Sequence, residues 1–345
     1  MPGPSSAEPA GKAALEAALA ALQAGNHAVA AEHFARVLRD DPKHVQAHHF
    51  VGGFAFQNGR YGEALQHFEE VRRLDPTDAR HAFNAAVAHL KLGGIEATRR
   101  CLEAALALDP GFEPVFAVLA NLDLPGAYYL DVLSAIHSHL RPRTYLEIGV
   151  ETGQSIALAR PETRAIGIDP APKLKMQLGS RTSIVATTSD DYFATRDVRA
   201  DLEGLPIDLA FIDGMHRFEF ALRDFVNIEK HAAPDSTILI HDCYPLNRLT
   251  AERERQTVFW SGDAWRLVLV LRKYRPDLSV NVIATAPTGL GVVRRLDPAS
   301  RVLGERLEEI GREFLALDYS VLDIDKPGML ALYPNDWERV KAILQ

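Results

Sequence analysis

The chain has 345 residues, which is long enough for two domains that each bury a sizeable core. Hydrophobic residues make up 47% of it and charged residues 24%, an ordinary composition for a soluble globular protein. The formal net charge of −8 argues against a surface that binds nucleic acid or an anionic membrane over its whole extent, although a local basic groove stays open.

Three features of the sequence predict a reducing, cytoplasmic location. Residues 1–10 have neither a basic segment nor an apolar core, so we expect no signal peptide. No apolar run approaches the roughly 18 residues that span a bilayer. Cys101 and Cys243 fall in segments that we assign to different domains, so we expect neither a disulfide framework nor a zinc site built from thiolates.

Residues 11–112 repeat with a period of 34. Small residues recur where two helices must approach closely, large apolar residues where they interlock, and proline where each helix pair ends. The recurring positions are Gly25, Gly59 and Gly93; Asp41, Asp75 and Asp109, each followed by proline; Phe34, Phe68 and Leu102; Val37, Val71 and Ala105; and Ala30, Ala64 and Thr98.

This period and these markers resemble the tetratricopeptide repeat, a helix–turn–helix unit of that length, and residues 51–64 match it best. The resemblance implies an all-α solenoid domain over residues 11–122, with about three repeats and a closing helix in 114–122. It also implies that the repeats bind a protein partner or a second copy of the chain.

After a linker near residues 123–126, the pattern changes to strands that alternate with helices, which predicts a parallel sheet with crossover helices. We expect strands near 144–149, 164–169, 183–187, 207–213 and 236–241, and an antiparallel hairpin of 279–285 with 290–294. Helices are expected near 127–140, 153–160, 190–199, 216–231, 263–274, 301–315 and 334–344. This order resembles the Rossmann-like, seven-stranded fold of class I S-adenosylmethionine-dependent methyltransferases, here over residues 126–345.

The end of the first predicted strand of this second domain carries the pattern of a nucleoside-cofactor site. A G-x-G-x-x-G dinucleotide fingerprint that begins at Gly149 would need glycine at positions 151 and 154, which are Glu151 and Gln154, so a nicotinamide cofactor is excluded. The remaining pattern, Glu147-x-Gly149-x-x-x-Gly153-x-Ser155, resembles the first motif of class I methyltransferases. Their fuller pattern has a middle glycine where this chain has Glu151, and catechol-type O-methyltransferases also lack it.

The resemblance implies a role in binding S-adenosylmethionine for seven residues. Glu147 would complement the methionine ammonium, Gly149 and Gly153 would give backbone access, and Ser155 at a helix start would bond the methionine carboxylate. Asp169, at the end of the second strand, would bind both ribose hydroxyls. Ser189 and Asp190 fall where the family contacts adenine.

Polar residues end the next two strands, and both strand ends should face the same crevice. Asp213 and Asp242 resemble the two aspartates that hold a divalent cation in catechol-type enzymes, which implies a possible Mg²⁺ site. The family's third ligand, an asparagine after the second aspartate, is Cys243 here, and magnesium disfavours sulfur. The sequence therefore leaves metal use open.

Two histidines are candidate general bases beside Asp213. His216 stands three residues after Asp213, where catechol-type enzymes place a lysine, and histidine titrates near neutral pH. His241 directly precedes Asp242, and neighbouring strand residues point to opposite faces. Both can therefore share one site only if the strand breaks there. The two motifs, Asp-Gly-x-His and His-Asp, also resemble a bacterial group of class I methyltransferases.

The segment 244–255 is long, polar and arginine-bearing, so it could form a substrate lid or an ordinary solvated helix. After it, Trp260 could supply an aromatic wall, whereas Trp265 is expected in the core.

We expect an enzyme that transfers methyl groups from S-adenosylmethionine, with an oxygen atom of a small or sugar-containing molecule as acceptor. One alternative is a protein methyltransferase whose repeats hold the substrate. Another is an adaptor that binds the cofactor without catalysis.

Overall fold

The computed structural model describes residues 8–345, so the N-terminal segment in which no signal peptide is expected lies mostly outside the described residues. The chain divides into two compact units, the first up to Leu119 and the second from Ala120 onward. Helix α7 (Glu113–Asp123) contains this boundary. Each unit is described by itself.

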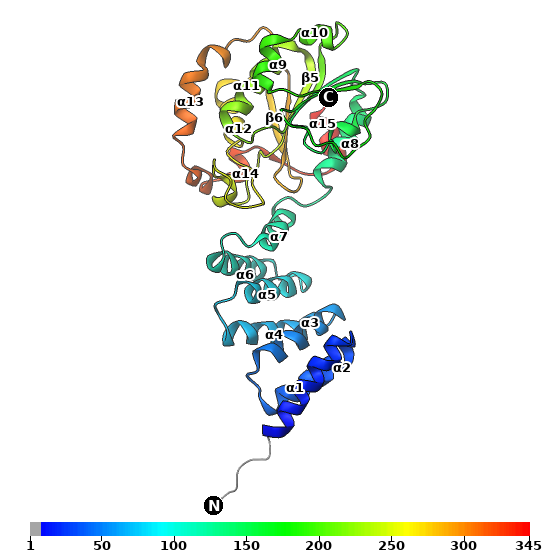
Figure 1. Ribbon diagram of the computed structural model, residues 1–345. Coiled ribbons are helices and arrows are strands. Elements are labelled where there is room, and N and C mark those ends of the chain that lie inside the picture. Colours follow the sequence, from blue (N-terminus) through cyan, green and yellow to red (C-terminus); the bar gives the residue numbers. More distant parts are fainter. Residues whose placement is uncertain (1–7) are drawn as a thin grey trace, which may run out of the picture. The chain divides into compact units, whose positions relative to one another are not determined.

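The repeat domain consists of helices that pack in antiparallel pairs (Figure 1). The pairs are α1 (Glu8–Gln23) with α2 (His27–Asp40), α3 (Val45–Gln57) with α4 (Tyr61–Leu74), and α5 (Ala79–Lys91) with α6 (Ile95–Leu108). The glycines that recur every 34 residues are required by the backbone conformation of the turn within each helix pair. Gly25, Gly59 and Gly93 have φ of +72°, +75° and +78°, the left-handed region that favours glycine.

The aspartates that precede the repeated prolines end the second helix of each pair. Asp41, Asp75 and Asp109 are the C-cap residues of α2, α4 and α6, and each donates its backbone N–H to a carbonyl four residues earlier. The following proline cannot continue the helix. The predicted interlocking positions are at most 5% exposed in all three repeats: Phe34, Phe68, Leu102, Val37, Val71, Ala105, Ala30, Ala64 and Thr98.

The second unit is built on one sheet, which among residues 8–345 has eight strands in the order β3-β2-β1-β4-β5-β7-β6-β8. The strands are β1 (Thr144–Ile148), β2 (Arg164–Ile168), β3 (Thr182–Val185), β4 (Ile207–Ile212), β5 (Ala232–Ile240), β6 (Ser279–Ile283), β7 (Leu290–Arg294) and β8 (Leu332–Tyr333). The first five are parallel, and β7 pairs antiparallel with both β5 and β6, as the predicted hairpin requires. The short β8 extends the seven expected strands.

Helices surround this sheet (Figure 1). They are α8 (Tyr129–Leu140), α9 (Ser189–Thr195), α10 (Val198–Asp201), α11 (Phe218–His231), α12 (Arg266–Tyr274), α13 (Leu307–Leu315), α14 (Lys326–Met329) and α15 (Trp337–Ile343). Every residue of β1 is buried, as expected for a parallel strand that is covered on both faces. The strand order reverses between β1 and β4, and ligands bind in the crevice beyond such a reversal. No helix within residues 8–345 has the length and apolarity needed to cross a bilayer.

Three predicted helices differ from the structure. The helix expected over 153–160 is only a 3₁₀ turn, Ile156–Leu158, because Pro161 follows closely and disfavours α-helical backbone before it. The helix expected over 190–199 is divided into α9 and α10, since the Asp197 side chain accepts the N–H of Ala200 and starts a new helix. Helix α11 begins at Phe218 instead of His216, because His216 has a left-handed φ of +54°.

Candidate active site

Three residues at the carboxyl ends of β1, β4 and β5 have left-handed backbone conformations although they are not glycine. Glu151, His216 and Asp242 have φ of +44°, +54° and +59°. Such conformations cost free energy and gather at functional sites. Strand β5 ends at Ile240, and the backbone turns in a left-handed conformation at Asp242. As a result, His241 contacts Asp213 and Asp242 contacts His216, both of which follow β4. The strand break that the two side chains need is therefore present.

The loop after β1 is held against the ends of β2 and β4. Asp169 accepts hydrogen bonds from the backbone N–H groups of Val150 (3.0 Å) and Glu151 (2.8 Å) through Oδ2 and from Ala171 (2.7 Å) through Oδ1. Gly149 has a φ of +87°, and a Cβ on it would lie 2.0 Å from the carbonyl oxygen of Asp213. The first glycine of the motif is therefore needed for both its conformation and its small size.

Glu147 is fully buried on β1 and is bound by two hydroxyl groups. Tyr145 Oη donates to Oε2 and Ser155 Oγ donates to Oε1, each at 2.6 Å. Burial raises the pKa of Glu147 to about 8, and the Asp213 charge adds to this rise, whereas the two hydroxyl groups oppose it. Ser155 stands beside a 3₁₀ turn, so the α-helix N-terminus on which its expected anion binding relied is absent there.

Two aspartates and two histidines form one cluster at the ends of β4 and β5. His216 Nδ1 lies 2.8 Å from Asp242 Oδ2, and His216 Nε2 lies 3.5 Å from Asp213 Oδ1. His241 Nδ1 lies 3.0 Å from Asp213 Oδ1 and 3.4 Å from Asp242 Oδ2. Each carboxylate thus contacts both imidazole rings, which ties the two strand ends together.

The charges of this cluster strengthen one another. Burial acts to lower the pKa of His216, but the carboxylates of Asp242 and Asp213 outweigh it and raise the pKa to about 9. The same balance raises the pKa of His241 well above its ordinary value. Burial acts to raise the pKa of Asp242, but the two histidines hold it far below its ordinary value. The cluster therefore favours imidazolium–carboxylate pairs.

Two cavities meet at this edge of the sheet and share Gly149, Asp169 and Gly214. One, of about 350 Å³, has apolar walls that include Ile148, Ile168 and Phe220, and polar groups from Thr188, Ser189, Asp190 and Asp224. The other, of about 420 Å³, is lined by Tyr129, Gly149, Val150, Glu151, Thr152, Gln154, Ser155, Asp169, Asp213, Gly214, His216 and His241. Glu147, Gly153 and Asp242 line neither of these two cavities.

Among the cavity residues that the sequence did not predict, two come from helices and bear on the chemistry of the site, Asp224 and Tyr129. Asp224 on α11 is 3% exposed, lies in the first cavity and has an Oδ1 without a hydrogen-bond partner. Burial raises its pKa to about 7, although a hydrogen bond with Ser189 opposes this. Tyr129 starts α8, and its ring lies 4.4 Å from that of His241. Both residues come from helices, so the strand-end pattern could not indicate them.

The segment after β5 packs against the cluster. Within 244–255 the structure has a single 3₁₀ turn, Leu249–Ala251, so the alternative of a solvated helix is wrong. Trp260 stacks on the His216 imidazole with centroids 5.3 Å apart and planes 8° from parallel. The backbone N–H of Asp263 donates to the His216 carbonyl oxygen at 3.0 Å, and this bond holds the segment around Trp260 against the residues that follow β4. Trp265 is fully buried, as expected.

The donor set for a cation differs from the one that magnesium prefers. Ligand atoms of Asp213, His216 and Asp242 lie within 4.8 Å of one another. Cys243, the residue after Asp242, is fully buried and directs its thiol to the Ile240 carbonyl oxygen at 3.3 Å. Two carboxylates and an imidazole suit a cation that accepts nitrogen better than they suit Mg²⁺, which takes oxygen ligands in octahedral geometry.

Family models match a stretch in each of the two units. Residues 146–243 match the family model of a methyltransferase domain. Residues 15–79 and 55–122 match two models of the tetratricopeptide repeat. The first match implies the use of S-adenosylmethionine, and the other two imply protein–protein interaction. No curated protein matches the chain.

Three solved structures share a low identity with the chain. The MamA protein has 17% identity and a TM-score of 0.31 over 38% of this chain and 68% of its own. YrrB, described as a TPR protein with an unusual peptide-binding site, has 19% identity and a TM-score of 0.29 over 31% of this chain and 56% of its own. An O-GlcNAc transferase mutant of Thermobaculum terrenum has 18% identity and a TM-score of 0.31, with 61% and 46% covered. The chain thus spans about half to two thirds of these proteins.

Proposed function

We propose that the protein transfers a methyl group from S-adenosylmethionine to an oxygen atom of a small or sugar-containing acceptor. The observation that carries this proposal is the pair of adjoining cavities, one with apolar walls and one beside the histidine–aspartate cluster. A nucleoside with a reactive sulfonium needs both environments next to each other. The histidine–aspartate cluster also supports the resemblance to catechol-type O-methyltransferases, in which polar residues end the fourth and fifth strands.

The cofactor would extend from the first cavity into the second. Adenine would lie between Ile148, Ile168 and Phe220, with Ser189 and Asp190 at its polar edge. Asp169 lines both cavities, so its carboxylate would bind the ribose hydroxyls where the two meet. Gly149 and Gly153 would allow close backbone approach.

The methionine end would lie near Glu147 and Ser155. An ammonium group close to Glu147 would favour its charged form and so offset the burial that raises its pKa. Ser155 Oγ would then remain bonded to Glu147, and its position on the second cavity would bring it near the methionine carboxylate.

His216 would accept the proton of the acceptor hydroxyl. His216 lines the second cavity, and its Nδ1 lies 2.8 Å from Asp242 Oδ2. Its Nε2 is 3.5 Å from Asp213 Oδ1, beyond the usual range of a hydrogen bond, so Nε2 would be the nitrogen that takes the proton. The acceptor oxygen would attack the sulfonium methyl, the carbon–sulfur bond would break, and sulfur would keep the electron pair as S-adenosylhomocysteine. His241 would act as a positioning residue, because its Nδ1 contacts the Asp213 carboxylate and its ring packs on Tyr129.

A divalent cation at Asp213 and Asp242 would supply positive charge that binds the acceptor oxygen and lowers its pKa. A cation that also took the His216 nitrogen would remove the base. His216 as base and His216 as ligand therefore exclude each other. Measuring activity after metal chelation distinguishes the two roles. Unchanged activity favours His216 as base, and lost activity that Mg²⁺ or Mn²⁺ restores favours a bound cation.

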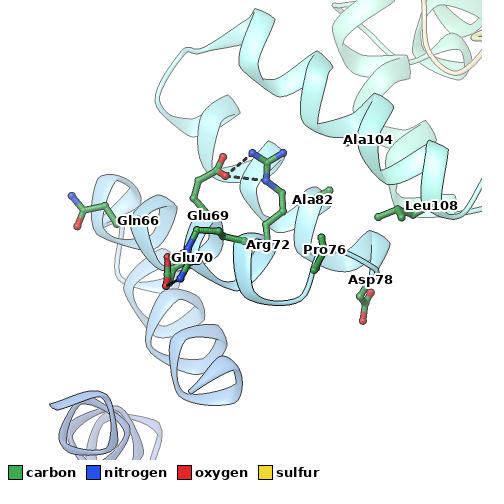
Figure 2. A pocket seen from close by; sticks show the side chains of 10 residues that line it. Gln66, Glu69, Glu70, Arg72, Pro76, Asp78, Ala82, Ala104 and Leu108 are labelled. Atoms are coloured by element: carbon green, nitrogen blue, oxygen red, sulfur yellow. Dashed lines mark hydrogen bonds and ion pairs between the residues drawn. The ribbon is translucent and has the colours of Figure 1, made fainter. Parts of the chain in front are cut away.

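The repeats would bind a protein partner or a second copy of the chain. A groove of about 570 Å³ lined by side chains of α4, α5 and α6 supports such a role (Figure 2). The same groove keeps open the alternative of a protein acceptor held by the repeats, and the expectation of a cytoplasmic enzyme stays a prediction.

Calorimetry with S-adenosylhomocysteine tests the cofactor assignment, and turnover of labelled methyl donor tests the reaction. We expect wild-type binding and at least ~10-fold weaker binding by Asp169→Ala, because the ribose hydroxyls lose their acceptor. No binding by the wild type, or equal binding by both, would refute the cofactor site. If Asp213→Ala and His216→Ala bind the cofactor and turn over like the wild type, our catalytic assignment is wrong and the active site lies elsewhere. If the wild type binds the cofactor but shows no turnover of labelled methyl donor, a non-catalytic adaptor replaces our proposal.

A further inference from the structure

A second group of side chains of the kinds that bind metal ions lies in the repeat domain, in the unit that does not contain the histidine–aspartate cluster. Glu69 comes from α4, His89 from α5 and Cys101 from α6. One ligand atom from each lies within 4.8 Å of the others. Three consecutive helices therefore bring a carboxylate, an imidazole and a thiol to one point.

Arg72 orients the carboxylate of this group. It donates to Glu69 Oε2 through Nε at 2.9 Å and through Nη2 at 2.6 Å, as the dashed lines in Figure 2 show. The other oxygen, Oε1, lies 3.5 Å from His89 Nε2. That separation is beyond the usual range of a hydrogen bond. Arg72 thus occupies one carboxylate oxygen and leaves the other turned to the imidazole.

The separations suit two ligands of one tetrahedral cation. Bond lengths of about 2.0–2.2 Å to nitrogen and oxygen and about 2.3 Å to sulfur place tetrahedral zinc ligands roughly 3.4–3.6 Å apart. The distance from Glu69 Oε1 to His89 Nε2 is already 3.5 Å. The thiol, within 4.8 Å of both, needs only a small movement to complete the set.

The chemistry of the donors selects the cation. Sulfur and imidazole nitrogen favour Zn²⁺ and similar borderline cations over Mg²⁺ and Ca²⁺. The side chains of Glu69 and His89 are 35% and 23% exposed, so the cation has a path from solvent and a water can fill the fourth position. Cys101 is buried, which raises the pKa of its thiol, so binding releases that proton to solvent.

We propose that Glu69, His89 and Cys101 form a Zn²⁺ site that links α4, α5 and α6. The site departs from the expectation that the chain has no zinc site built from thiolates, since it uses a single thiolate with two other ligand types. It is independent of the proposed methyl transfer. Its consequence is that Zn²⁺ stiffens the second and third repeats, which carry the groove of Figure 2.

Cobalt titration of the full-length, metal-free protein tests this site, because Co²⁺ replaces Zn²⁺ and a cysteine ligand gives a sulfur-to-cobalt charge-transfer band. We expect one equivalent of Co²⁺ to produce the band and Zn²⁺ to abolish it. Cys101→Ala should lose the band, whereas Cys243→Ala, which removes the other thiol, should keep it. Absence of the band in the wild type, or its loss in Cys243→Ala with retention in Cys101→Ala, overturns the proposal.

Two further variants keep the thiol and so remain informative if Cys101→Ala does not fold. His89→Gln and Glu69→Gln should each need at least ~10-fold more Co²⁺ for half of the band, since each loses one of three protein ligands. The matched control is Glu63→Gln, a partly exposed carboxylate on the same helix as Glu69. Equal titration curves for His89→Gln, Glu69→Gln and the control contradict the site.

Discussion

Replacing Asp224 by asparagine tests whether the buried carboxyl group of the first cavity is held in its neutral form. The pKa of Asp224 is about 7 in the folded chain, against an ordinary value of 3.8, and burial is the main cause. Because the folded pKa is raised, the folded chain holds this proton between these two pH values while the unfolded chain has lost it. The contribution of Asp224 to stability is therefore full below the unfolded pKa and is lost as pH rises toward 7.

The size of the effect follows from the width of this pH range. The free energy of unfolding should fall by about 1.36 kcal/mol per pH unit from this group, which is roughly 2 to 3 kcal/mol between pH 5 and pH 7. Asparagine has nearly the same shape, does not titrate and can still accept the Ser189 hydrogen bond. Asp224→Asn should therefore be more stable than the wild type at pH 8, and the advantage should shrink toward pH 5.

Tryptophan fluorescence during urea unfolding measures this difference in the correct domain. The chain has three tryptophans, Trp260, Trp265 and Trp337, and all lie in the unit from Ala120 onward. The fluorescence signal therefore does not report unfolding of the repeats, whose separate transition would otherwise break two-state behaviour. Asp323→Asn, at an exposed position on the 3₁₀ turn Tyr319–Asp323, is the control and should leave the pH dependence unchanged. An Asp224→Asn variant with the wild-type pH dependence, or one less stable than the wild type at pH 8, refutes the reasoning.

Three more predictions concern the proposed active site. His216→Gln should lower kcat by about 10² to 10⁴ with little change in the Kd of S-adenosylhomocysteine. Because only neutral His216 can accept a proton, kcat/KM of the wild type should rise about tenfold per pH unit below the His216 pKa of about 9, and a flat pH profile contradicts His216 as base. Gly149→Ala should abolish cofactor binding in calorimetry and lower the Tm, because its Cβ meets the Asp213 carbonyl at 2.0 Å, whereas Gly179→Ala, with ordinary contact distances, should do neither. Trp260→Ala should lower kcat through a misplaced His216 ring and leave cofactor affinity intact, and an unchanged kcat would mean that the stack has no positioning role.

Local sequence patterns were sufficient wherever one residue type meets a backbone requirement. The turn glycines at 25, 59 and 93 have positive φ, and Asp41, Asp75 and Asp109 end their helices, so a period of 34 predicted the repeat domain. Apolar runs ending in polar residues likewise predicted β1, β2, β4 and β5 and their shared edge. Local patterns failed at 153–160, where helical-looking residues form only a 3₁₀ turn.

Contacts between distant segments decided how the candidate site is assembled. Strand alternation places His241 and Asp242 on opposite faces, and only the left-handed turn at Asp242 lets His241 reach Asp213 while Asp242 reaches His216. Asp224 and Tyr129 reach the cavities from helices that carry no strand-end signal.

The sequence by itself determined the two kinds of domain, the order of their elements and the strand ends that carry polar residues, because backbone conformation and burial leave periodic, local marks. Only the tertiary structure decided which side chains share a cavity, which carboxyl groups lose their solvent and which imidazoles face a carboxylate. Those properties depend on packing between segments far apart in the chain, where burial and nearby charge change the pKa of Glu147, His216 and Asp224.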